Sequence, residues 1–224
     1  MKKIFIYLLL SISLIASSFE DSVKIDQLIN DNTIKYIFKD FEPVTGEKLR
    51  LYEIKKDKNL KKALYQLYFD YEKSKIKIYV PKKAESVYLN IELPKYKEAL
   101  NNLYKSDSVY AAWIGATLIH DRLIGFDQGN KFSDQSLQDL VNRYYPKFLT
   151  ILNKNNICYG YYLTEQYFKR YNKNHKKYLK YLNKSYKTCM KQNVPEWLKQ
   201  EVKLEYFQRK AYEKYKAKKK KEVK

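Results

Sequence analysis

Apolar residues recur at helical spacing along most of this chain. Between Asp57 and Tyr71 they gather on one side of a predicted helix, and residues 21–41 show the same pattern up to Glu42-Pro43. After Pro94 every segment has a helical pattern. The helices predicted there are 95–104, 108–124, a run from about 134 to 152 interrupted at Pro146, 158–171, 175–190 and 195–216. The chain is therefore predicted to be mainly α.

The pattern changes within the N-terminal region. Polar and apolar residues alternate over 76–80 and 87–93, which predicts two short strands and makes residues 19–93 a small α+β region. Consecutive helices joined by short links predict an array of α-hairpins over 94–216. The lysine-rich tail, 217–224, is predicted to fray.

Residues 1–18 have the organisation of a secretory signal peptide. Lys2 and Lys3 form a basic n-region, residues 4–16 carry no charge, and Ala16-Ser17-Ser18 supplies small residues at the cleavage site. The alternative is an uncleaved membrane anchor, but the apolar run is shorter than the ~20 residues that a spanning helix needs. The sequence therefore predicts a periplasmic or secreted protein with no transmembrane segment after cleavage.

Lysine dominates the charge of the chain. The formal net charge is +20, and residues 169–224 hold 20 basic residues against five acidic ones. This excess has three interpretations: the composition of an AT-rich genome, attraction to an anionic envelope surface, and nucleic-acid binding. Nucleic acid is the least favoured, because only five of the 45 basic residues are arginines and because an exported protein rarely meets its own cell's nucleic acid.

The chain has two cysteines, Cys158 and Cys189. If 158–171 and 175–190 are antiparallel helices, the start of the first lies beside the end of the second. In an oxidising compartment such a pair forms a disulfide that closes a loop around one helix pair. The alternative is a pair of buried free thiols.

The helices around these cysteines resemble the Sel-like repeat family, relatives of tetratricopeptide repeats, and especially its secreted, cysteine-rich branch. Residues 158–163 (CYGYYL) are similar to the first helix of such a repeat, and 180–189 (KYLNKSYKTC) to the second. A weaker likeness is 110–116 (YAAWIGA), whose small residues would let another helix approach closely. Leu163-Thr164 departs from the family's Leu-Gly step, and the glycine-rich interhelix loop is missing. The resemblance covers residues 95–216 and implies stapled helix pairs with a concave binding face.

Tyrosines and lysines of this half are the candidate partner-binding residues. A protein or peptide partner is predicted to contact Tyr161, Tyr162, Tyr178, Lys176, Lys180 and Lys184. The alternative is that the tyrosines pack against each other and that the lysines line a solvated helix face. In the last helix an apolar stripe comprises Trp197, Leu204, Phe207, Ala211 and Tyr215.

The sequence shows no catalytic, cofactor-binding or metal-binding set of residues. His120 and His175 have no partner at metal-ligand spacing, and Ser74-x-x-Lys77 matches a motif of penicillin-recognising enzymes without its companion motifs. The predicted function is non-catalytic binding of a protein or peptide by an exported helical protein. The alternative is a basic periplasmic protein on an anionic envelope surface. Since some Sel-like proteins have been called β-lactam binding, the resemblance also implies a remote enzyme alternative, β-lactam binding or hydrolysis.

Overall fold

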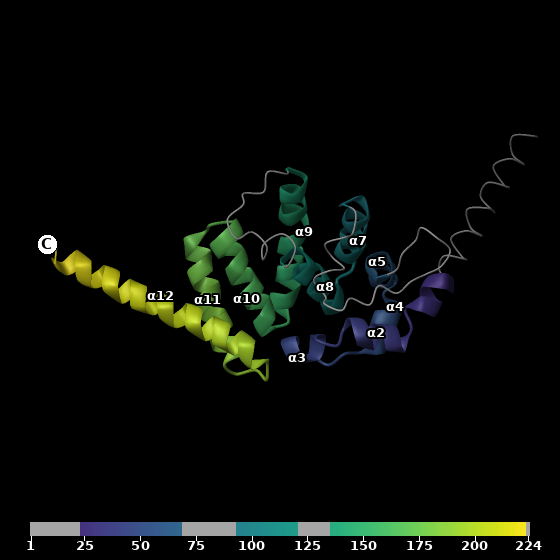
Figure 1. The fold of residues 1–224 in the computed structure, drawn as a ribbon, viewed down its shortest axis with the longest axis horizontal. Coiled ribbons are helices and arrows are strands. Elements are labelled where there is room, and N and C mark those ends of the chain that lie inside the picture. The colour runs from purple at the N-terminus through teal and green to yellow at the C-terminus, as the bar shows by residue number, and fades with distance from the viewer. Residues whose placement is uncertain (1–22, 69–92, 121–134, 223–224) are drawn as a thin grey trace, which may run out of the picture.

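The computed structural model describes residues 23–68, 93–120 and 135–222, and every element within these ranges is a helix (Figure 1). This confirms the predicted mainly α fold. Residues 23–28 are helical, and the elements that follow are α2 (Asp31–Ile37), α3 (Phe41–Thr45), α4 (Leu51–Lys56), α5 (Lys58–Tyr68), α7 (Leu93–Lys105), α8 (Val109–Ile119), α9 (Gln135–Lys154), α10 (Cys158–Gln166), the π-helical turn η2 (Tyr167–Tyr171), α11 (His175–Cys189) and α12 (Glu196–Glu222).

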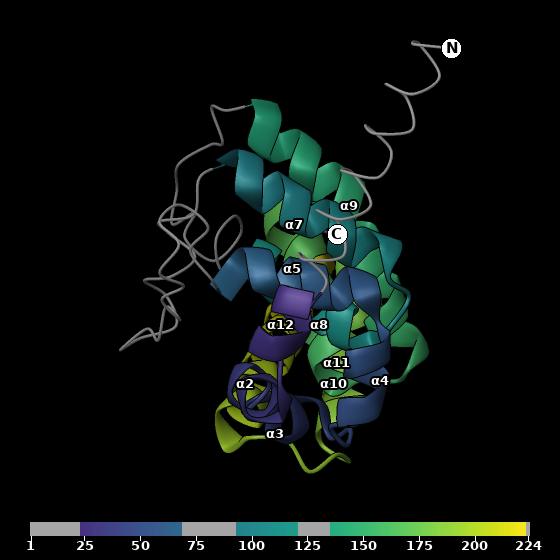
Figure 2. The ribbon, with the colours of Figure 1, turned by 90° about the vertical axis from the view of Figure 1, so that its right-hand side faces the viewer.

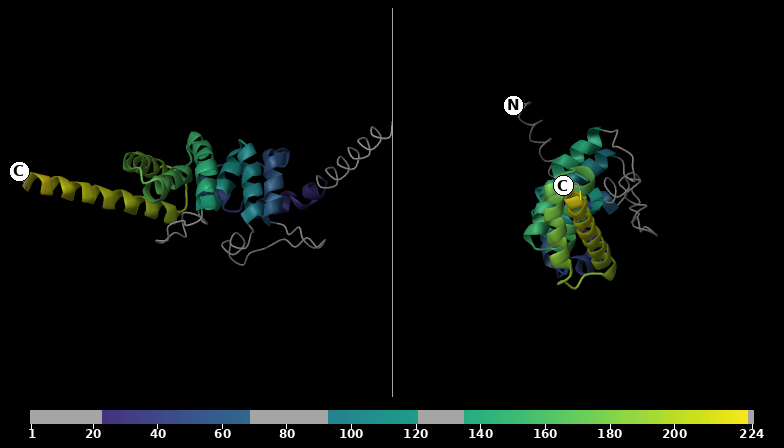
Figure 3. Two further views of the ribbon diagram at one scale, coloured as in Figure 1. Left: turned by 90° about the horizontal axis from the view of Figure 1, so that it is seen from above. Right: turned by 90° about the vertical axis from the view of Figure 1, so that its left-hand side faces the viewer.

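Helices that follow one another in the described part of the chain pack against each other. α5 contacts α7, α8 contacts α9, and α10 contacts α11, while α7–α8 and α9–α10 contacts join these pairs into one stack (Figure 2). The last helix, α12, packs on α11 and then projects well beyond the rest of the described fold (Figure 3). Because only one side of α12 meets α11, much of its surface stays exposed.

One hydrophobic core crosses the predicted boundary between residues 93 and 94. Phe38 and Phe41 pack their rings against Tyr110 and Trp113 of α8, with ring centroids 5.0–5.9 Å apart. α5 also pairs with α7, which lies on the other side of the predicted boundary. The N-terminal helices therefore share their core with the C-terminal array.

The sequence predicts that Pro43 ends one helix and that Pro146 interrupts another, but the structure shows neither. Pro43 lies in the first turn of α3, where the missing N–H costs no intrahelical bond, and α3 ends instead at Gly46 with φ 73°. Pro146 lies inside α9, which continues through it to Lys154. The predicted helix end at Glu42-Pro43 and the interruption at Pro146 are therefore wrong.

Two further helix ends differ from the sequence prediction. Ser108, the first residue of the predicted helix 108–124, is instead the N-cap of α8, since its hydroxyl accepts the N–H of Ala111 over 3.2 Å. The helix predicted to end at residue 216 is longer, because α12 remains helical to Glu222. The described part of the lysine tail is thus a continuation of α12.

Two glycines allow α8 and α10 to approach α9 closely. A Cβ added at Gly115 would lie 2.4 Å from the ring of Phe148, and one added at Gly160 would lie 2.6 Å from the Cβ of Leu152. Real side chains essentially never come so close. The small residues around Gly115 therefore permit the close helix contact that the sequence predicts.

The predicted signal peptide at 1–18 and the predicted strand at 76–80 lie outside the described residues. The predicted strand at 87–93 also lies outside them except for Leu93, which begins α7. Within the described ranges, none of the helices has the length and apolar character needed to cross a membrane.

Candidate functional site

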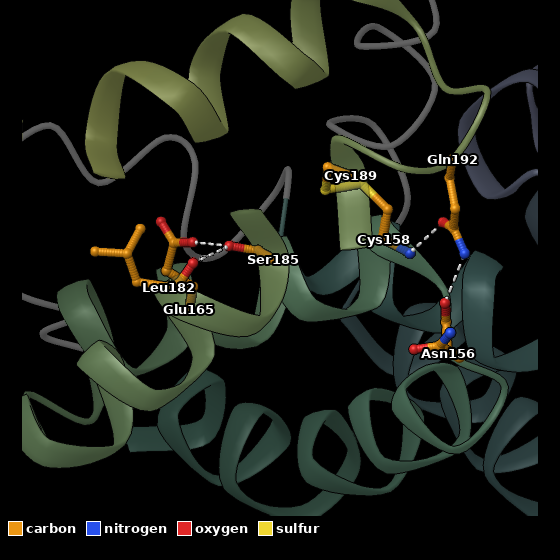
Figure 4. The surroundings of a disulfide bond; sticks show 7 residues. All are labelled: Asn156, Cys158, Glu165, Leu182, Ser185, Cys189 and Gln192. Carbon is orange, nitrogen blue, oxygen red and sulfur yellow. Dashed lines mark hydrogen bonds between the residues drawn. A yellow bond between two sulfur atoms is a disulfide. The ribbon is translucent and has the colours of Figure 1, made fainter. Parts of the chain in front are cut away.

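The two cysteines join the ends of the α10–α11 hairpin. Cys158 begins α10 and Cys189 ends α11, with their sulfurs 1.98 Å apart and their Cα atoms 4.9 Å apart (Figure 4). The chain reverses direction at 172–174, where Asn174 caps α11 by accepting the N–H of Lys177. The sequence prediction of this cysteine pair is confirmed.

A side chain from the loop after α11 connects the disulfide end of the hairpin to the loop between α9 and α10. The amide of Gln192 accepts the N–H of Cys158 over 2.9 Å and donates to the carbonyl of Asn156 over 2.8 Å (Figure 4). Asn156 has φ 54°, in the left-handed region that Asn tolerates better than most residues. The disulfide end of the hairpin is therefore fixed by a covalent bond and by two hydrogen bonds.

Glu165 is a fully buried carboxyl between α10 and α11. The hydroxyl of Ser185 donates to its Oε2 over 2.7 Å (Figure 4). The amide of Gln166 donates to its Oε1 over 3.2 Å. Burial raises the pKa of Glu165 to about 7, because the two hydrogen bonds compensate only in part for lost hydration. The sequence analysis missed this group, since Ser185 lies 20 residues away in the chain.

A cavity of about 390 Å³ lies between the turn of the α10–α11 hairpin and α12. We call it the hairpin-tip pocket, and it is lined by Phe168, Lys169, Lys173, His175, Tyr178, Glu205, Gln208, Arg209 and Tyr212. The π-helical turn η2 contributes Phe168 and Lys169. Such turns are often found at functional sites.

The carboxylate in the hairpin-tip pocket is already neutralised. Glu205 forms an ion pair with Lys169 at 2.6 Å and accepts a hydrogen bond from the hydroxyl of Tyr178. Burial by itself would raise the pKa of Glu205, but these two hydrogen bonds and the nearby cations lower it. Burial and the contact with Glu205 raise the pKa of Tyr178, so its phenol stays protonated and acts as a donor.

The remaining cations of the hairpin-tip pocket are less well neutralised. Arg209 donates to the Nε2 of His175 over 2.6 Å, lies over the ring of Tyr212, and reaches Glu213 only through a 3.4 Å contact. Lys173, at φ 52° in the hairpin turn, has no ion pair with any residue in the described ranges. The pocket therefore offers positive charge beside aromatic walls.

The predicted partner-binding residues differ in burial, although Lys184 lies over the ring of Tyr161 at 5.4 Å. Tyr161 and Tyr178 are buried, and the hydroxyl of Tyr161 donates to the carbonyl of Asn153. Tyr162 is partly buried and stacks on Tyr159 at 6.2 Å. Of the three tyrosines only Tyr178 lines the hairpin-tip pocket. The predicted lysines are exposed on α11 and do not line the pocket: Lys176, Lys180 and Lys184.

The two histidines occupy different environments. His120 ends α8 next to Tyr162, and burial lowers its pKa to about 4. His175 lies at the hairpin-tip pocket, a place that sequence spacing did not indicate. Within the described residues, no group of three or more His, Cys, Asp or Glu side chains is placed to hold a metal ion. Ser74 and Lys77 lie outside the described residues.

Comparisons with protein-family models, with curated proteins and with solved structures find no match for this chain.

Proposed function

We propose that this chain is an exported, non-catalytic helical-hairpin protein that binds a peptide segment of a protein partner in its hairpin-tip pocket. The observation that carries the proposal is the composition of this pocket. It combines aromatic walls with cationic groups that its own carboxylate does not neutralise. Pockets of a few hundred Å³ with a few polar groups are typical binding sites.

The group that fits this pocket best is a carboxylate next to an apolar side chain. Arg209 presents a planar guanidinium, which suits a carboxylate in two-point contact, and Lys173 supplies a second charge nearby. Phe168 and Tyr212 offer ring surface for the neighbouring apolar group. An Asp or Glu side chain beside an aromatic residue in an extended peptide has both parts.

The chain contains two histidines, and His175 is therefore a specific NMR reporter of the pocket. The probe is an N-acetylated, C-terminally amidated Phe-Asp dipeptide, with the Phe-Asn dipeptide as its uncharged counterpart. We expect Phe-Asp to shift the imidazole signals of His175 and to leave those of His120 unchanged. Phe-Asn is expected to bind much more weakly, because it lacks the charge.

Two arginines provide a matched pair of variants. Arg209→Gln removes a charged donor from the pocket and should weaken Phe-Asp binding by at least about tenfold. Arg143→Gln removes an exposed arginine that lies over Tyr144 at 5.3 Å, outside the pocket, and should leave binding unchanged. Equal losses in both variants would mean that the peptide only follows net charge.

The exposed lysines of α11 test the binding residues predicted from sequence. A variant with Lys176, Lys180 and Lys184 all changed to Gln keeps the pocket intact. We expect it to weaken binding modestly and mainly to reduce the dependence on salt, since exposed charges act through a screened field. Loss of binding at every salt concentration would favour the alternative in which charge alone directs association.

A further inference from the structure

The apolar stripe that the sequence predicts on α12 lies on the exposed side of the helix. Each of its large side chains is at least half exposed: Trp197 50%, Leu204 57%, Phe207 50% and Tyr215 63%. They are four of the nine large hydrophobic residues that are exposed in the described ranges. Such a concentration on one helix is unusual for a surface with no binding role.

The packing of α12 on α11 holds this stripe outward. Leu198 and Val202 are buried on the inner side of the helix, and Tyr206 stacks on Tyr186 of α11 at 4.0 Å. At about 100° per residue, Trp197, Leu204 and Tyr215 lie within roughly 20° of each other around the helix. Since the helix rises about 1.5 Å per residue, the stripe is roughly 27 Å long.

The helix that carries the stripe has an excess of positive charge. α12 contains ten basic and five acidic residues. Its lysines with described side chains form no ion pair within the described part of the chain, and they are Lys199, Lys203, Lys210, Lys214, Lys216, Lys218 and Lys219. Lysine can extend its charged end away from an apolar surface on which its methylene groups lie. An occupant of the stripe must therefore combine an apolar layer with a negative surface.

We infer that α12 docks lengthwise on the surface of an anionic lipid bilayer, with the stripe in the headgroup layer and its lysines among the lipid headgroups. Aromatic rings make up most of the stripe, and Trp and Tyr favour the membrane–water interface. Basic helices with one such face bind anionic membranes in this orientation. The inference extends the second function that the sequence predicts, association with an anionic envelope surface.

Two other occupants fit the stripe less well. A second copy of the chain would bring two helices of like net charge together, which opposes association. A partner helix in a coiled coil would be matched better by aliphatic residues, whereas Leu204 is the one large aliphatic residue of the stripe. A lipid surface meets both the charge and the aromatic composition.

The test uses the mature full-length protein and two kinds of vesicle. One is phosphatidylcholine alone, and the other is phosphatidylcholine and phosphatidylglycerol in equal parts. Trp197 is half exposed while Trp113 is 7% exposed, so a blue shift of tryptophan emission reports burial of the stripe. We expect co-sedimentation and a blue shift with the anionic vesicles, both weakened by salt, and neither with neutral vesicles.

Variants separate stripe docking from general charge attraction. Leu204→Glu with Phe207→Glu should reduce vesicle binding by at least about tenfold, because both charges would enter the apolar boundary. The control is Tyr52→Glu on α4, at a residue that is 65% exposed and distant in the chain, and it should bind normally. Changing Lys203, Lys210 and Lys214 to Gln should weaken binding by roughly fivefold per lysine.

Several results would overturn the inference. Equal binding to neutral vesicles would exclude the role of charge, and unchanged binding of the double variant, Leu204→Glu with Phe207→Glu, would exclude the stripe. Dimers in sedimentation velocity that this variant abolishes would identify a second copy as the occupant. An acidic protein cross-linked at position 204 in the absence of lipid would identify a protein occupant. Peptide binding in the hairpin-tip pocket is measured through His175 in the absence of lipid. Failure of that proposal can therefore be distinguished from failure of the proposal that α12 docks on a bilayer.

Discussion

Replacing Glu165 by Gln is expected to change how stability depends on pH. The carboxyl of Glu165 is fully buried, and its pKa rises from 4.5 to about 7 on folding. Between these two pH values the folded state holds a proton that the unfolded state has lost. The contribution of Glu165 to the free energy of unfolding therefore falls as pH rises through this window, by roughly 3 kcal/mol in total.

His120 changes the free energy of unfolding with pH in the opposite direction, over nearly the same pH range. Burial lowers its pKa from 6.5 to about 4, so here the unfolded state binds the extra proton. Its contribution to stability rises with pH between these values and is of similar size. The two effects largely cancel in the natural protein. The free energy of unfolding of that protein alone would therefore change little with pH.

The difference in the free energy of unfolding between the natural protein and Glu165→Gln isolates the contribution of the carboxyl. Gln has nearly the same volume and can still accept the hydrogen bond of Ser185, but it does not ionise. At about pH 4.5 the two proteins should have similar stability. At pH 8 the Gln variant should be more stable by up to about 3 kcal/mol, because it buries no charge.

Guanidinium unfolding followed by circular dichroism measures this difference at each pH. The stability of Glu165→Gln itself should increase between about pH 4 and 6.5, since the slope of His120 is then unopposed. A constant difference between the two proteins across the whole range would refute the reasoning. It would mean that the carboxyl ionises with its usual pKa in the folded protein.

Three further outcomes concern the hairpin and the N-terminal segment. Cys189→Ser opens the loop of 31 residues back to Cys158, which should cost about 4 kcal/mol and lower the melting temperature by roughly 10 °C without loss of helical circular dichroism. Gly160→Ala should destabilise by roughly 1–3 kcal/mol in denaturant unfolding, because the new methyl group meets Leu152 and its backbone. N-terminal sequencing of protein from the periplasm or medium should begin near Phe19, and an intact Met1 in the cytoplasm would contradict export.

The helices and the disulfide could be predicted from sequence because both depend on local spacing. The 3.6-residue period predicts helices at 158–171 and 175–190, and a hairpin then brings Cys158 and Cys189 together by geometry alone. The π-helical end of the first helix was not predictable in this way. The period of apolar residues does not distinguish an α-helical turn from a slightly wider one.

The buried side of α12 could not be predicted, because it has two apolar faces. Trp197, Leu204 and Phe207 form the larger one in the sequence, and a periodic pattern cannot say which face meets a neighbour. In the structure the smaller face, with Leu198 and Val202, is the buried one. The hairpin-tip pocket was missed for a related reason, since its residues come from η2, the turn at 172–174, α11 and α12 and converge only after packing.

The polar contacts of the hairpin-tip pocket explain why α12 buries its smaller apolar face. Turning the helix by roughly a third of a turn would bury the stripe against α11. The same rotation would withdraw Glu205 from Lys169 and Tyr178, leaving the buried phenol without its acceptor. An unpaired buried polar group costs about 1–3 kcal/mol, and the stack of Tyr206 would be lost as well. The contacts that build the pocket on one side of α12 therefore hold the stripe outward on the other.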